Sequence, residues 1–180
     1  MHGLFGKRAA QVSQLLDGYN MKGVVFMQWV YDDGGRAEAG FKGTTGDCVC
    51  RAISIAAERP YKEVYDLINE YAKSERTGKR KRGKSSARTG VYKRTIRKAM
   101  EHYGWKWTPT MFVGQGCKVH LQADELPSGR LVVEVAKHCT AVIDGVIHDI
   151  YNPNDRGYVV DGYGNDITTN RCVYGYYSKE

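Results

Sequence analysis

Residues 137–149 read Lys-His-Cys-Thr-Ala-Val-Ile-Asp-Gly-Val-Ile-His-Asp, and this stretch decides the fold. Two apolar runs flank an Asp-Gly pair, which is the strongest short-range sequence signal for a tight β-hairpin. With Asp144 and Gly145 as the two turn residues, Ile143 pairs with Val146, and side chains alternate between the two faces of the sheet from there outward. The stretch therefore predicts two neighbouring antiparallel strands in this register.

Other segments also have the period of strands. Apolar residues alternate or run continuously after residue 104, at Trp105 with Trp107, in 131–135, 158–160 and 171–177. Residues 23–31 read as a further buried strand that ends in turn residues. We expect the segments after residue 104 to extend the hairpin into a larger antiparallel sheet.

The chain before this sheet has the 3.6-residue period of helices. Apolar residues fall on one face in 5–16, 49–56, 61–73 and 91–103. Asp47 is suited to cap the N-terminus of the second of these helices. Helices first and an antiparallel sheet second predict an α+β fold, in which N-terminal helices pack on a C-terminal sheet.

Length and composition limit how the chain is organised. A sequence of 180 residues with 42% hydrophobic residues predicts a single domain over 1–180, in which 1–30 form an extension of one helix and one strand. No run of about 18 apolar residues and no secretory signal are present, so we expect no membrane partner. The cysteines number five, which is odd, and we expect reduced thiols in a cytosolic compartment.

Positive charge is concentrated in one segment. Residues 74–98 contain eleven Lys and Arg against one Glu, a net +10, whereas the whole chain carries +7 and the remainder therefore −3. Because 74–90 is polar and rich in Gly and Ser, we expect a mobile basic loop outside the core. Charge runs are usually solvated, but this density also fits contact with nucleic acid or a ribosome through residues 76–97. The residues expected to make that contact are Arg76, Lys79, Arg80, Lys81, Arg82, Lys84, Arg88, Lys93 and Arg94.

Cys48 and His138 are the candidate nucleophile and base. Cys48 falls in the first turn of the helix predicted over 49–56, where the helix dipole and free backbone N–H groups stabilise a thiolate. His138 begins a predicted strand, and an imidazole aimed at the sulfur can hold the thiolate as an ion pair and later protonate a leaving group. The two residues therefore suggest a cysteine active site.

The hairpin supplies a third candidate residue for this active site. In the register given above, Asp149 and His138 share one face of the sheet as diagonal neighbours, and a carboxylate there can fix the tautomer of the imidazole. Asn152 falls on the opposite face and is our second choice for the orienting group. A bulge near His148 would reverse this preference.

Five segments together resemble a known family. They are 46–53 (Gly-Asp-Cys-Val-Cys-Arg-Ala-Ile), 104–111 (Gly-Trp-Lys-Trp-Thr-Pro-Thr-Met), 116–121 (Gly-Cys-Lys-Val-His-Leu), 137–149 and 171–177 (Arg-Cys-Val-Tyr-Gly-Tyr-Tyr). The chain is similar, over residues 31–180, to largely uncharacterised phage-encoded proteins that are papain-like and cysteine peptidase-like. The resemblance implies a papain-like fold, the order Cys-His-Asp, and a location in the cytoplasm of an infected host cell, with association with the virion as a further expectation.

One position departs from active papain-like enzymes. Those proteins place a Gln a few residues before the cysteine to complete the oxyanion hole, whereas 41–46 here read Phe-Lys-Gly-Thr-Thr-Gly. Thr44, Thr45 or the backbone N–H of Cys48 could donate instead, because removing one oxyanion donor costs about 3 to 4 kcal/mol without abolishing catalysis.

Simpler interpretations compete with this one. A lone helical Cys or a strand His is often only a core residue, and alternating Trp105 and Trp107 are more often half-buried than free to stack on bases. Zinc ligands at Cys48, Cys50, Cys117 and His120 fit less well, because residues two apart on a helix point to nearly opposite sides. We expect no metal and no cofactor, with Cys139 and Cys172 as core or surface thiols.

The sequence thus predicts a thiol hydrolase or acyltransferase of the cysteine peptidase or amidase type, acting on an acyl or peptide substrate of unknown identity. The alternative is a catalytically silent papain-like scaffold that binds nucleic acid, a ribosome or another host complex through the basic loop.

Overall fold

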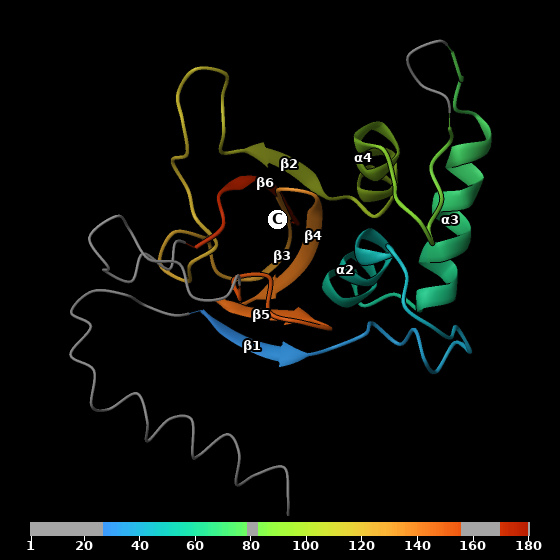
Figure 1. Cartoon of the computed structure of the whole chain (residues 1–180), viewed down its shortest axis with the longest axis horizontal. Coiled ribbons are helices and arrows are strands. Elements are labelled where there is room, and N and C mark those ends of the chain that lie inside the picture. The colour runs from blue at the N-terminus through green and yellow to red at the C-terminus, as the bar shows by residue number, and fades with distance from the viewer. Residues whose placement is uncertain (1–26, 79–82, 156–169, 180) are drawn as a thin grey trace, which may run out of the picture.

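The structure is a computed structural model that describes residues 27–78, 83–155 and 170–179. These residues form three helices, α2 (Cys48–Ala57), α3 (Tyr61–Lys73) and α4 (Lys93–His102). They also form six strands, β1 (Gln28–Tyr31), β2 (Lys106–Pro109), β3 (Arg130–Val135), β4 (His138–Ile143), β5 (Val146–Asp149) and β6 (Val173–Ser178) (Figure 1). The helix predicted over 5–16, the strand predicted over 158–160 and the first part of the strand predicted over 23–31 lie outside the described residues.

The strands make one mixed sheet in the order β1-β5-β4-β3-β6-β2. Every pair is antiparallel except β1 with β5, which runs parallel, with Gln28 opposite Val146. The predicted α+β class is confirmed. The sheet is antiparallel as predicted except at one edge, where β1 pairs with β5 in the parallel direction. No tight turn links β1 to β5, because all three helices intervene, and such a long connection permits the parallel direction.

The central hairpin has the predicted register. Ile143 lies opposite Val146, and both turn residues have left-handed backbone angles, with φ of 48° at Asp144 and 78° at Gly145. This conformation matches the right-handed twist of the flanking strands, which is why the Asp-Gly pair is favoured there. The carboxylate of Asp144 also accepts a hydrogen bond from the backbone N–H of Gly129 at 2.8 Å, so the turn is tied to the loop before β3.

Alternate residues along the strands belong to two core clusters, one on each face of the sheet. On the helical face, Val132 and Ala141 join Ile53 of α2 in the larger cluster. On the other face, Leu131 and Val142 pack in a smaller cluster. The helices gather beside one face of the curved sheet (Figure 1). Because each face carries a core cluster, the central strands are buried on both sides.

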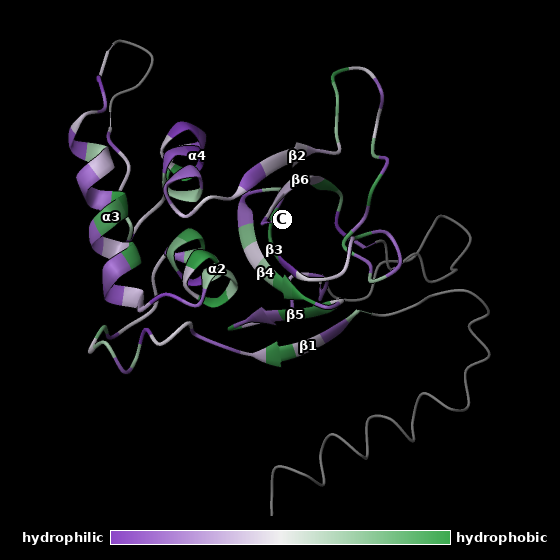
Figure 2. Ribbon diagram, turned by 180° about the vertical axis from the view of Figure 1, so that it is seen from behind, coloured by the Kyte–Doolittle hydropathy of each residue, from purple (hydrophilic) through white to green (hydrophobic). Residues whose placement is uncertain are grey.

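Helix α2 is the central element of the helical half. It packs on β4 and against α3, and eight of its ten residues are buried. Figure 2 shows α2 as largely apolar and α4 as largely hydrophilic, consistent with α4 lying at the periphery. The run of small and β-branched residues from Val49 to Ala56 lets α2 approach both neighbours closely. The start of this helix is thereby fixed against the sheet.

Part of the predicted basic loop is packed into the protein. The Ala87 side chain is buried in the larger core cluster, and its backbone N–H donates to Asn69 Oδ1 on α3 at 3.0 Å. Ser85 is also buried and donates from both its backbone N–H and its hydroxyl to the carboxylate of Glu75. The expectation that 74–90 lies outside the core is therefore wrong for 85–87, because Glu75 and Asn69 supply buried partners. No helix in the described ranges is long and apolar enough to cross a membrane.

Replacing Asn69 with Ala should lower the free energy of unfolding by about 1 to 3 kcal/mol, because the N–H of buried Ala87 would lose its acceptor. Urea denaturation followed by circular dichroism measures the change. Lys62→Ala on the exposed side of the same helix is the matched control and should stay within about 0.5 kcal/mol of the unmodified chain. Equal effects of the two substitutions would contradict the packing of this segment.

Candidate active site

The structure brings Cys48, His138 and Asp149 together. Cys48 is the first residue of α2, His138 the first residue of β4, and Asp149 the last residue of β5. The His138 side chain is near enough to the Cys48 thiol to lower its pKa, and His138 Nε2 lies 2.7 Å from Asp149 Oδ2. The imidazole and the carboxylate are nearly excluded from solvent, whereas Cys48 is half-buried. A sulfur, an imidazole and a carboxylate thus lie together in one site.

The surroundings of Cys48 favour its thiolate. Burial alone would raise the pKa of the thiol, but the hydrogen bond and positive charge of His138, the Cys139 backbone N–H and the Arg51 guanidinium together lower it below the ordinary value of 9.0. The position at the start of α2 acts in the same direction, because the helix N-terminus is electropositive. Cys48 therefore has the electrostatic setting of a nucleophile.

The imidazole is correspondingly easy to protonate. Burial would lower the pKa of His138, but its hydrogen bonds to Asp149 and Cys48 and their negative charges raise it to about 9. The lowered thiol pKa and the raised imidazole pKa both favour a thiolate–imidazolium pair.

The other free thiols of the described chain are in a different environment. Burial raises the pKa of Cys50 to about 12, and burial also raises the pKa of Cys139 well above its ordinary value. Both side chains are core residues. Among the free thiols of the described chain, Cys48 alone has a lowered pKa, and its greater reactivity stays a prediction.

Asp47 does not cap α2 with its side chain. It occupies the position before the helix, but its carboxylate is turned into the protein, where it is fully buried. There it pairs with Arg36 at 2.8 Å and with Arg51, and it accepts a hydrogen bond from the Tyr61 hydroxyl at 2.6 Å. The predicted cap is wrong because three donors compete successfully for the carboxylate.

Arg51 links this ion cluster to the candidate site. One guanidinium nitrogen pairs with Asp47, and the other lies 3.5 Å from Asp149 Oδ1. The Asp149 carboxylate is thus shared between His138 and a buried cation on α2. Sequence reasoning missed this role, although Arg51 lies one helical turn after Asp47, the spacing of a helical ion pair.

A second residue missed as a contact is Tyr151. Its hydroxyl lies 3.0 Å from His138 Nδ1, and the two rings are 5.0 Å apart. Tyr151 remains 46% exposed, so it covers the imidazole on the solvent side. Alternation of side chains along the second hairpin strand puts Tyr151 on the same face as Asp149, but it gives no distance to His138.

Thr44, Thr45 and Asn152, the other predicted site residues, make no hydrogen bond to His138 within the part of the chain that the structure describes. The Thr45 hydroxyl donates to the backbone carbonyl of Arg88, which makes it a poor oxyanion donor. Thr44 is exposed, and its side chain has no partner among the described residues. Asn152 Oδ1 accepts from the backbone N–H of Asn154 in a local turn, so Asp149 is the group that contacts His138.

The basic residues expected to bind nucleic acid fall into three sets. Lys79, Arg80, Lys81 and Arg82 lie outside the described residues. Lys84 and Arg88 donate to the backbone carbonyls of Lys73 and Lys42, at 2.8 and 3.3 Å. Arg76, Lys93 and Arg94 line two surface cavities beside α4.

Two cysteines expected to be reduced form a disulfide. Cys117 is bonded to Cys172, which precedes β6. The prediction of five free thiols is wrong for these two. Cys117 lies in the loop after β2 and Cys172 just before β6, and folding brings these residues, 55 apart in sequence, into contact. The zinc alternative loses Cys117 as a ligand, and no cluster of three or more potential metal-ligating side chains occurs in the described part of the chain.

Comparison of the chain with family models, with curated proteins and with solved structures gave no match. The chemistry of the site is therefore argued from its own residues and distances.

Alkylation by iodoacetamide should modify Cys48 faster than any other thiol at mildly acidic pH, because its pKa is lowered and those of Cys50 and Cys139 are raised. The rate should rise with pH through the lowered thiol pKa, since the thiol is protonated below it. In His138→Gln this rise should move to higher pH, because the charge that stabilises the thiolate is gone. Peptide mapping by mass spectrometry measures the rates, and an unshifted profile would exclude the ion pair.

Asp47→Ala should lower the free energy of unfolding by about 3 to 5 kcal/mol, because it removes the buried counter-ion of Arg36 and leaves Arg51 with Asp149 alone. Asp66→Ala is the matched control, since Asp66 pairs with Lys62 on the exposed side of α3 and an exposed pair contributes about 1 kcal/mol or less. Urea denaturation of both variants measures the difference, and similar midpoints would show that the Asp47 cluster adds nothing.

Proposed function

We propose that the protein is a papain-like thiol hydrolase or acyltransferase in which Cys48 is the nucleophile. The observation that carries the proposal is the continuous row of Cys48, His138 and Asp149, with the sulfur at a helix start. Nucleophile, base and orienting group in hydrogen-bond contact are the arrangement that covalent acyl transfer requires. A helix bearing the cysteine on a sheet bearing the histidine is also the arrangement that a papain-like fold would have.

The chemistry proceeds in two steps. The Cys48 thiolate attacks an acyl carbonyl, a carbon–sulfur bond forms, and the bond to the leaving group breaks as His138 donates its proton to that group. The product is a thioester on Cys48. His138 then takes a proton from water or from another acceptor, which attacks the thioester, releases the acyl group and regenerates the thiolate.

Asp149 and Tyr151 position the imidazole in this scheme. Because Asp149 holds Nε2 at 2.7 Å, the sulfur would exchange its proton with Nδ1, the nitrogen that the Tyr151 hydroxyl also contacts. The Asp149 carboxylate stabilises the imidazolium, and the Tyr151 hydroxyl at 3.0 Å from Nδ1 limits rotation of the ring. Arg51 holds the other oxygen of Asp149, so the row is anchored in the buried ion cluster.

The oxyanion is stabilised by the groups nearest the sulfur. The backbone N–H of Cys48 lies in the first turn of α2, where N–H groups have no partner within the helix. The Tyr151 hydroxyl lies 3.0 Å from Nδ1, the imidazole nitrogen that Asp149 does not hold. These two donors replace the Gln of active papain-like enzymes, since the Thr45 hydroxyl is engaged with Arg88.

Incubation with an activated ester such as p-nitrophenyl acetate should leave one acetyl group on Cys48, detected by intact mass and peptide mapping. Cys48→Ala and His138→Ala should each reduce acylation by several orders of magnitude, because they remove members of one catalytic unit. Cys50→Ala, which removes a thiol two residues away, is the control and should acylate normally. With this ester the rate should rise with pH through the lowered thiol pKa and then level off, because nitrophenolate leaves without a proton, whereas with an amide substrate it should decline above about pH 9 as His138 loses its proton. Equal acylation of Cys48→Ala and the unmodified chain would refute the proposal.

A further inference from the structure

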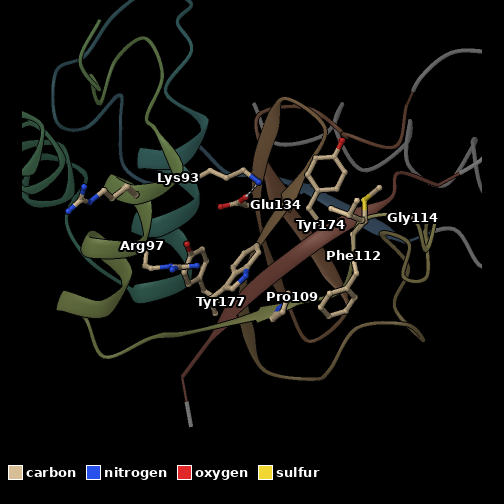
Figure 3. Close-up of a pocket in the computed structure, with 13 residues that line it drawn as sticks. Lys93, Arg97, Pro109, Phe112, Gly114, Glu134, Tyr174 and Tyr177 are labelled. Carbon is tan, nitrogen blue, oxygen red and sulfur yellow. Dashed lines mark ion pairs between the residues drawn. The ribbon is translucent and has the colours of Figure 1, made fainter. Parts of the chain in front are cut away.

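A cavity of about 690 Å³ lies between α4, the β2–β6 pair and the loop over residues 111–116, and we call it the α4 groove. Its size is within the range of about 300 to 1,000 Å³ typical of ligand sites. In Figure 3, Lys93 and Arg97 reach in from α4 on one side, with Phe112 and Tyr174 on the other. The groove contains neither Cys48 nor His138, so it is a separate feature of the surface.

One wall of the groove is positively charged. Lys93, Arg94 and Arg97 all line it, and all three are exposed on α4. The only acidic residue in the lining is Glu134, a buried side chain whose Oε2 lies 3.5 Å from Lys93 Nζ. Within the described part of the chain, no carboxylate pairs with Arg94 or Arg97. Arg97 is near the Glu134 carboxylate and the Tyr177 hydroxyl, each of which interacts with its charge, so the wall offers to an anion two guanidinium groups of which one is partly compensated.

The opposite side supplies aromatic surface. Trp107, Phe112 and Tyr174 line the cavity, and the Phe112 side chain is 51% exposed. The Trp107 indole lies directly over Gly175, where an added Cβ would come within 2.3 Å of the ring. A glycine on β6 thus allows the indole to rest on the strand, and its position is set before any ligand arrives.

The loop that carries Phe112 is held in place at both ends. Thr110 donates from its hydroxyl to the Val173 carbonyl at 2.7 Å and from its backbone N–H to Tyr174 at 3.2 Å. At the other end, Cys117 is bonded to Cys172. Between these anchors the side chains of Met111, Phe112 and Val113 are all exposed, which is an unusual concentration of apolar surface.

The charged wall continues beyond the groove. Arg94 also lines a second cavity of about 650 Å³, together with Arg76 and Lys98. A ligand that follows α4 from the first cavity to the second would there meet three cationic side chains and one carboxylate, that of Glu75, which accepts hydrogen bonds from Ser85. This favours an extended polyanion over a single small anion.

We propose that the α4 groove binds single-stranded nucleic acid, with bases stacked on Phe112 and Trp107 and phosphates at Arg94 and Arg97. The Tyr174 ring has the Lys93 ammonium over its face, 5.6 Å from the centroid, and adds to the cationic wall. Cations that follow a backbone beside aromatic faces are the combination that single strands use, because their bases are free to stack. A duplex would leave the aromatic side unused, and a chain of acidic side chains such as polyglutamate has no aromatic rings to stack there. The inference is independent of the chemistry proposed for Cys48.

Fluorescence anisotropy with labelled oligothymidylate and oligouridylate of about a dozen nucleotides tests the proposal on the full chain. Phe112→Ala should weaken binding about ten-fold through lost stacking. Arg94→Ala with Arg97→Ala should weaken it further and make the logarithmic salt dependence shallower by about 1.4, or about 0.7 for each lost phosphate contact. The DNA and RNA probes show which sugar the groove prefers.

Each test substitution has a control of the same chemical type elsewhere on the surface. Tyr31→Ala removes an exposed aromatic from β1, and Lys62→Ala with Lys73→Ala removes two exposed cations from α3, and both should bind as the unmodified chain does. Binding that survives Phe112→Ala and the double arginine change would overturn the α4 groove as the site. So would absence of binding at low salt, or tighter binding of polyglutamate than of either oligonucleotide.

Discussion

A buried guanidinium joins the two halves of this protein. Arg51 extends from α2 to Asp149 on β5 while its other nitrogen is held by Asp47, so two carboxylates from different elements share one cation. Removing such charges from water costs several kcal/mol each, and this cost is offset only when all members are paired. The start of α2 and the end of β5 are therefore fixed relative to each other. His138 is hydrogen-bonded to the same Asp149, and its distance from the sulfur of Cys48 depends on that attachment.

Local patterns in the sequence were sufficient for the hairpin and for the three main site residues. The Asp144-Gly145 turn set the register, and alternation along two strands then placed His138 and Asp149 on one side of the sheet. The start of α2 could be found from the period of its apolar residues, which put Cys48 in the first turn. These inferences succeeded because each depends on contacts close in sequence or fixed by a two-residue turn.

The remaining features depend on partners that are distant in the chain. Asp47 was expected to cap a helix, but Arg36 and Tyr61 are brought to it only by tertiary folding. The parallel direction of β1 and the bond between Cys117 and Cys172 also join segments with no short connection. Residue composition likewise could not show that Ala87, within a polar basic segment, fills a core position against α3. Each failure reflects long-range pairing rather than an incorrect local preference.

The bond between Cys117 and Cys172 makes the protein respond in two ways to one reagent. A reductant such as dithiothreitol keeps the sulfur of Cys48 free of oxidation, and it also cleaves an accessible disulfide. The loop bearing Phe112 would then be retained at β6 by backbone and side-chain hydrogen bonds alone, those of Thr110 at one end and those joining Val119 to Val173 and Leu121 to Arg171 at the other. A buffer chosen to preserve the nucleophile therefore also removes the covalent tie of one wall of the α4 groove, and the redox state of the solution acts on two regions that share no side chain.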